Sequence, residues 1–297
     1  MSKVVARKGI GVHVHGGAVR LVKTGARGQI TGLGAAQMGQ TDDLTQAIKQ
    51  AMAAAGCGGG RCSVSVADRE VILQTAVLPY MEGDALTRNA HSEIASHLAL
   101  SADAYHISYK ITGLTQTGNQ RQIKLMLAAV QRQTADRLMG ALKEAGLRAT
   151  HLEVSENALE KLISLSAPGQ NAAVLEVSGT EALFTVFLGG RFYISRFLTE
   201  TLEADLPAGE PMDAFVSEVS SVLEYGYYRE RHQKVGRLFV GGAVNESQRD
   251  YLGETLGIPS APLQELLTPH LAAGGPQTKN AADFGAAYGA LLREVSL

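Results

Sequence analysis

The amino-acid sequence predicts an α/β protein made of two βββαβα halves, with a small α+β subdomain inserted between them. Segments in which apolar and polar residues alternate open the chain, and glycine pairs separate them, which is typical of hairpin-connected strands. The same order of elements returns in the C-terminal part, after a stretch of different pattern. The expected boundaries are 1–70 for the first half, 71–150 for the inserted subdomain, 151–170 for a return segment and linker, and 171–297 for the second half with a C-terminal helix.

The composition is that of an ordinary globular protein. The chain has 297 residues, of which 45% are hydrophobic and 19% charged, and its formal net charge is −2, so disorder is not expected. We expect no membrane span and no secretory signal, because no apolar run approaches the ~20 residues that cross a bilayer. Two cysteines suggest a reducing compartment, and the near-neutral charge gives no general case for binding nucleic acid.

Basic residues gather ahead of Asp42, the first acidic residue of the chain. Two interpretations remain open for this asymmetry. The basic residues form a solvated surface, or they contact an anionic partner or membrane headgroups. These residues are Lys3, Arg7, Lys8, Arg20, Lys23 and Arg27.

In the first half, three strands and a helix are expected before a fourth strand. Residues 10–14 alternate between two faces, and Gly16-Gly17 predicts a tight turn because glycine tolerates positive φ. Thr41 or Asp42 is the candidate N-cap of the helix. The expected elements are strands at 10–14, 18–23, 29–37 and 63–66, and a helix at 44–55.

The inserted subdomain follows a different pattern. Its segment 122–130 is continuous and mostly apolar, which predicts a central strand. The other expected strands are 71–78, 105–114 and 151–154, and the expected helices are 84–100, 134–145 and 156–165.

The second half repeats the order of the first without residue-level identity. The predicted helix at 212–231 carries apolar residues at spacings of three and four. The small residues of 281–295 predict a closing helix that approaches its neighbours closely. The expected strands of this half are 172–177, 183–188, 192–197 and 237–240.

Several residue groups have both a functional and an ordinary interpretation. His13 and His15 share one strand face and have metal-binding spacing, but no further ligand can be assigned, so we interpret them as polar strand positions. Cys57 and Cys62 lack a second cysteine pair and are expected to be free thiols. We expect Tyr225 and Tyr228 to pack at the core edge, and Tyr227 lies beside them. Glu153, Glu156 and Glu160 lie at helical spacing and are expected on a solvated face.

The pair Gly241-Gly242 follows a predicted strand and precedes a helix expected to begin near Asn245. Such a turn either cradles a nucleotide with backbone N–H groups and the helix dipole, or simply connects strand and helix. The sequence leaves both alternatives open.

A family resemblance is carried by several segments in order along the chain, namely 11–20, 71–80, 145–147, 153–159, 173–179, 217–228 with 237–243, and 281–289. With the repeated order of elements, they resemble the actin-like ATPase superfamily, and in detail the PilM-like proteins of type IV pilus assembly. The resemblance implies that 11–20 and 173–179 are the two phosphate hairpins. It implies that 71–80 leads into the inserted subdomain and that 145–147 with 153–159 leads back out of it.

The sequence departs from the family pattern at both hairpins. The family's first aspartate, glycine and lysine fall on His13, His15 and Arg20, and the second aspartate and glycine fall on Glu176 and Ser178. Histidine removes an oxygen ligand suited to Mg²⁺, and a side chain in place of glycine keeps phosphate from backbone N–H groups. Only 198–211 stand where the family has a second closing subdomain, which is therefore expected to be reduced or absent. We expect little or no ATPase activity, no catalytic residue and no metal site.

No cofactor is expected, and ATP with Mg²⁺ is the alternative. If nucleotide binding is retained, the resemblance implies a site made of Gly16, Gly17, Arg20, Glu176, Ser178, Thr180, Gly241 and Gly242.

The resemblance implies an adaptor that binds a short N-terminal cytoplasmic peptide of an inner-membrane assembly protein, in a groove between the first half and the inserted subdomain. We expect apolar pockets for an extended peptide along Ile107, Tyr109 and Ile111. The protein would be cytoplasmic and peripheral to the inner membrane through this partner, without inserting into the bilayer, and self-association stays open. The alternatives are an ATP-binding switch or ATPase of the same family, and a kinase of this architecture, for which no base carboxylate can be placed.

Overall fold

The computed structural model describes residues 2–38, 43–229, 233–276 and 284–296. The chain divides into two compact units, Met1–Ala67 with Ala141–Leu297, and Asp68–Gly140. Across the described part of the chain, no helix combines the length and the apolar character that crossing a membrane requires.

The strands of the first half join β9, which follows the inserted subdomain in sequence, in a five-stranded sheet of the larger unit with the order β4-β3-β2-β5-β9. Strand β2 is antiparallel to β3 and parallel to β5. Helix α1 (Leu44–Ala54) is capped by Asp43, whose carboxylate accepts a hydrogen bond from the backbone N–H of Gln46 at 3.0 Å. The cap is thus neither Thr41 nor Asp42, which lie outside the described residues. The strands are β2 (Gly9–His15), β3 (Ala18–Thr24), β4 (Ile30–Gln37), β5 (Gly60–Ala67) and β9 (Leu147–Val154).

The second half forms a sheet with the same plan, in the order β12-β11-β10-β13-β14. Strand β10 is antiparallel to β11 and parallel to β13, as β2 is to β3 and β5. Helix α5 (Asp213–Arg229) packs on this sheet through buried Phe215 and Val219. Matching strand orders confirm the predicted α/β fold of two related halves. The elements are β10 (Ala172–Ser178), β11 (Glu181–Leu188), β12 (Arg191–Phe197), β13 (Arg237–Gly242), α6 (Glu246–Leu256) and β14 (Ser260–Pro262).

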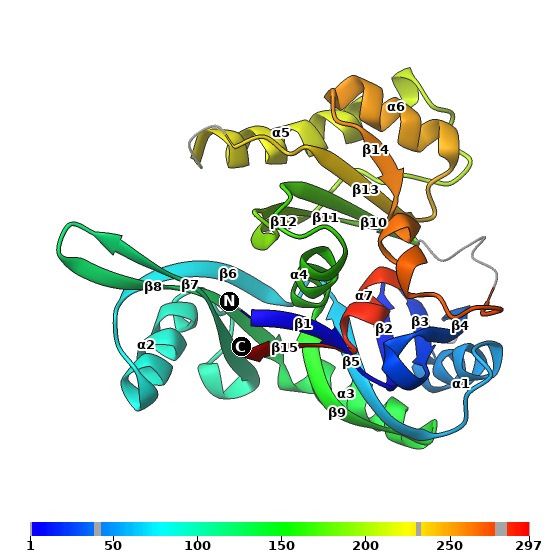
Figure 1. Ribbon diagram of the computed structural model, residues 1–297, viewed down its shortest axis with the longest axis horizontal. Coiled ribbons are helices and arrows are strands. Elements are labelled where there is room, and N and C mark those ends of the chain that lie inside the picture. The colour runs from blue at the N-terminus through cyan, green and yellow to red at the C-terminus, as the bar shows by residue number, and fades with distance from the viewer. Residues whose placement is uncertain (1, 39–42, 230–232, 277–283, 297) are drawn as a thin grey trace. The chain divides into compact units, whose positions relative to one another are not determined.

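Two helices lie between these sheets (Figure 1), α4 (Ser155–Ser166) and α7 (Gly285–Gly289). Helix α4 contacts β5 on one side and β12 on the other, and α7 packs on α4 and β2. The helices approach closely because Gly289 has no side chain; a Cβ there would stand 2.2 Å from the carbonyl oxygen of Ala158. The small residues predicted for close packing therefore do lie at a helix–helix contact.

The smaller unit contains a three-stranded sheet in the order β6-β8-β7, so β8 (Gln120–Gln131) is central, as predicted. Helix α2 (Gly83–Ala95) covers one face through buried Leu86, Ala90 and Ile94, and it ends five residues before the predicted end. The other elements are β6 (Ile72–Pro79), β7 (Tyr105–Thr117) and α3 (Arg132–Glu144), whose last turn belongs to the larger unit.

The prediction of one long helix at 281–295 is wrong. Residues 281–283 lie outside the described part, and α7 ends at Gly289. Strand β15 (Leu292–Ser296) follows and pairs antiparallel with β1 (Ser2–Ala6), a strand that sequence patterns missed. Pairing across nearly the whole chain length leaves no local signal, which explains both errors.

Candidate functional site

The first hairpin joins β2 to β3 through Gly16 and Gly17, at φ values of 54° and 73°. His13 and His15 point into the protein interior and are each 1% exposed. Arg20 on β3 stands opposite His13 in the antiparallel register and is also buried. The first hairpin therefore presents imidazoles and one guanidinium at the positions where the sequence resemblance implied a phosphate-binding loop.

The second hairpin joins β10 to β11 through Gly179 and Thr180, both exposed. Glu176 and Ser178 on β10 are buried. Glu176 pairs with Gly241 across the parallel β10–β13 ladder. The structure thus brings the second hairpin and the double glycine to one edge of one sheet.

The two hairpins touch each other directly. The Ser178 hydroxyl donates a hydrogen bond to the carbonyl oxygen of His15 at 2.7 Å, and Arg20 Nη1 donates to Ser178 Oγ at 3.1 Å. A Cβ on Gly16 would stand 2.1 Å from the carbonyl oxygen of Ser178. Gln37 adds a hydrogen bond to the Gly16 carbonyl oxygen at 3.2 Å. Backbone and side-chain groups of the chain itself therefore occupy the space between the hairpins.

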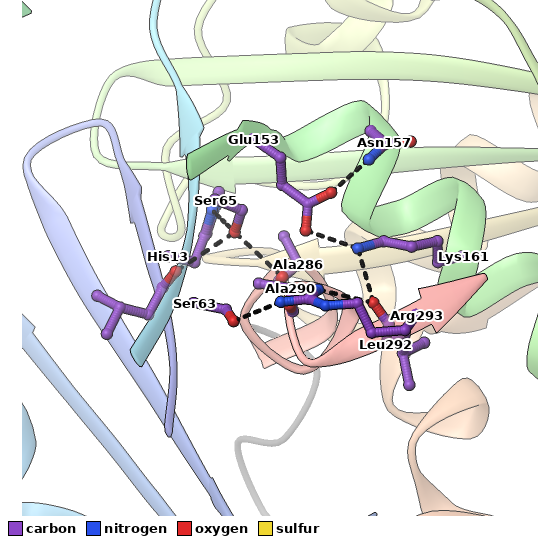
Figure 2. A network of polar contacts seen from close by, with 11 residues as sticks. His13, Ser63, Ser65, Glu153, Asn157, Lys161, Ala286, Ala290, Leu292 and Arg293 are labelled. Carbon is purple, nitrogen blue, oxygen red and sulfur yellow. Dashed lines mark hydrogen bonds and ion pairs between the residues drawn. The ribbon is translucent and has the colours of Figure 1, made fainter. Parts of the chain in front are cut away.

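The imidazoles of His13 and His15 are packed inside the protein. The rings of His13 and His15 lie 5.9 Å apart, and Phe197 meets His15 edge-on. Burial, His15 and the Arg20 guanidinium lower the pKa of His13 well below its usual value, while a hydrogen bond with Ser65 opposes that shift. Figure 2 shows His13 joined to Ser65, whose hydroxyl donates to the carbonyl oxygen of Ala286 at 3.1 Å.

In the described part of the chain, His13 and His15 belong to no cluster of metal-ligating side chains. Within the described ranges, no group of three or more His, Cys, Asp or Glu side chains converges on one point.

Cys57 and Cys62 are both free thiols, as expected. Burial raises the pKa of Cys62 to about 11, so this thiol is protonated at neutral pH.

Gly241 and Gly242 end β13, and the following helix is capped by its own residues. The Asn245 side chain accepts a hydrogen bond from the Gln248 backbone N–H, and the Gln248 side chain accepts one from that of Asn245. The Gln248 amide nitrogen also donates to the carbonyl oxygens of Glu203 and Leu206, each at 2.8 Å. The segment after β12 therefore lies over the start of α6.

That segment is short and forms no strand in 198–212, all of which the structure describes. Leu198 and Leu202 are buried in the core of the second half. The Glu218 carboxylate on α5 accepts hydrogen bonds from the backbone N–H groups of Thr199 and Glu200 at 2.9 to 3.0 Å. The segment is packed down on its own half and builds no further subdomain.

The residues expected to contact a peptide differ in their exposure to solvent. Ile107 and Tyr109 pack on the core beneath α2, and the Tyr109 hydroxyl lies 3.1 Å from Thr87 Oγ1. Ile111 is 50% exposed, and Leu114, three residues further along β7, is 58% exposed. Strand β7 is an edge of its sheet, and the far end of the β7–β8 hairpin extends beyond α2 (Figure 1).

Of the acidic residues predicted to be solvated, Glu156 and Glu160 are buried and Glu153 is half-buried. Glu160 is fully buried on α4; it accepts the backbone N–H of Phe192 at 2.9 Å and pairs with Arg191 at 3.0 Å. Glu156 is 5% exposed and accepts a hydrogen bond from Ser195 at 2.9 Å, and burial raises its pKa. The solvated interpretation is wrong because α4 lies between two sheets, and sequence spacing did not reveal these partners.

Lys161, also on α4, was missed by sequence reasoning. Its ammonium contacts Glu153 at 2.6 Å and donates to the carbonyl oxygen of Leu292 at 3.0 Å, while Asn157 donates to Glu153 (Figure 2). Burial raises the pKa of Glu153, and Lys161 partly offsets this shift. A lysine among the apolar positions of a helix was the available signal.

The aromatic residues on α5 were expected at the core edge. Tyr225 is instead 46% exposed, so the prediction is wrong for this residue. The side chains of Tyr227 and Tyr228 lie outside the described part.

No family model and no curated protein sequence matches the chain. Many solved structures are similar to the chain, among them the following three. The PilM–PilN type IV pilus biogenesis complex matches with a TM-score of 0.77 at 17% identity, over 96% of this chain and 98% of that one. The cytoplasmic domain of EpsL, an inner-membrane component of the type II secretion system of Vibrio cholerae, matches at 0.50 and 12% identity, over 88% and 93%. A Bacteroides thetaiotaomicron protein with an actin-like ATPase fold matches at 0.51 and 10% identity, over 89% and 91%.

These likenesses show that the chain has the actin-like ATPase fold. Identities of 10 to 17% carry the fold and nothing more specific.

Proposed function

We propose that this chain is a non-enzymatic, actin-like adaptor of a type IV pilus or related secretion machine. It docks the N-terminal cytoplasmic peptide of an inner-membrane assembly protein and reaches the membrane through that partner. The choice of machine is supported by likeness to PilM in the PilM–PilN complex along nearly the full length of both chains, and by likeness to the cytoplasmic domain of EpsL.

One observation carries the non-enzymatic part of the proposal, namely the direct contact between the two hairpins. Phosphoryl transfer needs charge-neutralising groups around the phosphates and a cation-binding oxygen ligand. Here Ser178 bonds to the backbone of the first hairpin, Arg20 bonds to Ser178, and imidazoles stand on β2. Nucleotide would have to break these contacts before its phosphates entered.

The docking part rests on the smaller unit, taken by itself. Strand β7 is an edge that offers backbone groups to an added strand, and Ile111 and Leu114 give it exposed apolar side chains. An extended peptide uses such an edge for main-chain hydrogen bonds and such side chains for specificity.

The test uses synthetic peptides that cover the N-terminal cytoplasmic segments of inner-membrane proteins encoded beside this chain. We expect one peptide to bind, and Ile111→Glu/Leu114→Glu to weaken its Kd at least about tenfold, because a charge replaces apolar anchors. The control is Leu100→Glu, an equally exposed apolar position (54%) before the start of β7, which should leave the Kd unchanged. The docking proposal fails if no peptide binds, or if all variants bind alike.

An ATP-binding switch of the same fold is the second candidate. Arg20 favours it, because a guanidinium there binds phosphate well once the hairpins separate. Binding of ATP that survives in the presence of Mg²⁺ and is lost in Arg20→Gln would move this candidate ahead of the adaptor.

A further inference from the structure

A cavity of about 370 Å³ opens on the larger unit, away from the two hairpins. It lies among the connection from β1 to β2, the start of β5, strand β9 and the beginning of β15. Its charged and polar lining comes from Arg7, Lys8, Arg61, Ser63, Thr150, His151 and Arg293. Four of these seven residues are arginine or lysine, which are cationic at neutral pH.

No carboxylate is among the described residues that line this cavity. Arg148 adds a further cation, since it pairs with Arg61 in the parallel β5–β9 ladder. The Glu153 carboxylate, which acts electrostatically on Arg293, is itself paired with Lys161 at 2.6 Å. The cavity is therefore a concentration of positive charge in a chain whose net charge is −2.

Among the cations that line the cavity, Arg293 is held in place by hydrogen bonds. Arg293 Nη1 donates to the carbonyl oxygens of Ala290 and Leu292 at 2.9 and 3.0 Å, and its Nη2 donates to Ser63 Oγ at 2.8 Å (Figure 2). A guanidinium has five N–H donors, so donors remain for a ligand. Burial lowers the pKa of Arg293, Glu153 partly offsets that shift and Arg7 adds to it, so a bound anion would further stabilise the charged guanidinium.

The pKa of His151 is also lowered by the positive charge around it. Burial is the largest cause, and Arg293, Lys161 and Arg7 lower the pKa further. The imidazole is therefore neutral at pH 7 and is able either to donate or to accept a hydrogen bond.

The volume of the cavity and its apolar lining indicate which anions it can hold. Ile10, Cys62 and Leu291 supply apolar surface beside the cations. A volume at the low end of small-molecule pockets exceeds the size of a single phosphate group and suits a compact organic ester. Arginine forks match the geometry of phosphate oxygens.

We propose that this cationic cavity binds the phosphate ester of a small organic group, with Arg293 as the fixed anchor and Arg7, Lys8 and Arg61 around it. This site is independent of the hairpins and of the adaptor proposal. It assigns the basic N-terminal residues Arg7 and Lys8 to an anionic ligand. Arg61 and Arg293 lie far from them in the sequence and line the same cavity only in the folded chain. The ester is either a soluble metabolite or the headgroup of an anionic lipid.

The test is calorimetric titration of glycerol 3-phosphate and inorganic phosphate into the full chain, with sedimentation of phosphatidylglycerol and phosphatidylcholine vesicles as a second arm. We expect saturable binding of the ester, weakened at least about tenfold by Arg7→Gln/Arg61→Gln, because two charge-assisted contacts are lost. The matched control is Lys49→Gln/Lys143→Gln, which removes two exposed cations elsewhere on the larger unit and should change the Kd less than about twofold.

Arg293→Lys is a further variant that keeps the charge and removes the fork. This variant should weaken binding of the ester more than the Lys49→Gln/Lys143→Gln control does. Binding confined to phosphatidylglycerol vesicles, and lost in Arg7→Gln/Arg61→Gln, identifies a lipid headgroup as the source of the same chemistry. The proposal is overturned if neither ester nor anionic vesicles bind, or if the control variant weakens binding as much as Arg7→Gln/Arg61→Gln.

Discussion

At the scale of single residues, the two imidazoles on β2 are the least ordinary feature of the molecule. His13 and His15 are almost completely buried, and Arg20 lies opposite His13 on the neighbouring strand. Protonating His13 would place a second cation beside that guanidinium at a buried position. The folded state therefore requires the neutral imidazole.

This requirement predicts a pH dependence of stability. Because the pKa of His13 is lowered in the folded state by burial, His15 and Arg20, the unfolded chain takes up a proton first as the pH falls below 6.5. The contribution of this residue is complete above pH 6.5 and is lost below it, at up to about 1.4 kcal/mol per pH unit. Urea unfolding between pH 7.5 and pH 5 measures the free energy of unfolding.

His13→Asn is the comparison that isolates this group, because His151 and His270 also have lowered pKa values, each with burial as the first cause. Asparagine can keep a hydrogen bond to Ser65 and does not titrate. We expect a shallower decline in the variant than in the natural sequence. Parallel pH profiles for the two proteins would show that His13 is not the responsible group.

Sequence alternation correctly placed both histidines on one strand face. It did not place Ser178 against them, since that contact joins positions 163 residues apart and depends on how two separately formed sheets meet. The sequence shows which residue types stand in the two hairpins. Only the packed structure shows that Ser178 and the backbone of His15 fill the space between them.

At the scale of elements, α4 stabilises the larger unit from its centre. It carries buried ionic groups to both sheets, and Glu160 is the most buried of them. The Glu160 carboxylate accepts the N–H of Phe192 at the start of β12, so it satisfies a backbone donor that the sheet leaves open. Arg191 contributes less, because its side chain is 42% exposed and screened by solvent.

We predict that Glu160→Ala lowers the free energy of unfolding by about 2–3 kcal/mol, because a buried N–H loses its charged acceptor. Glu294→Ala is the matched control; it removes the other carboxylate that contacts Arg191, at 3.2 Å and on the surface, and should cost less than about 1 kcal/mol. Denaturant titration of both variants measures the difference. Equal losses would mean that the ion pair with Arg191, and not the bond to Phe192, is what α4 contributes.

The order of elements was predictable wherever the pattern was local. Hairpins with glycine turns, the central strand β8 and the helix after Asn245 all follow from alternation, apolar runs and capping residues. The pairing of β15 with β1 was not predictable, because small residues such as Gly285 and Ala290 also fit a longer helix and the partner strand lies at the other end of the sequence. Exposure on α4 was misjudged for the same reason, since helical spacing cannot show that both sides of a helix are covered.

At the scale of the whole molecule, the larger unit is a duplicated fold whose two halves meet where the resemblance implies a nucleotide. Each half keeps its strand order. The hairpins of the two halves contact each other through His15, Arg20 and Ser178, and the start of α6 is capped by Asn245 and Gln248. The Ser178 hydroxyl, Arg20 Nη1 and the Gln248 backbone N–H are thus bonded to groups of the chain itself. These bonds are what distinguishes the proposed adaptor from an ATPase of the same fold.

Whether the hairpin contacts exclude nucleotide is measured by calorimetric titration of ATP with Mg²⁺ into the purified, nucleotide-stripped chain, with a thermal-shift assay on the same samples. We expect no binding heat and no change in Tm at about 1 mM ATP, since entry of phosphate must first break the contacts between the hairpins. Saturable binding near about 1 μM, worth about −8 kcal/mol, would show that nucleotide enters despite these contacts and would make the ATP-binding switch the leading function.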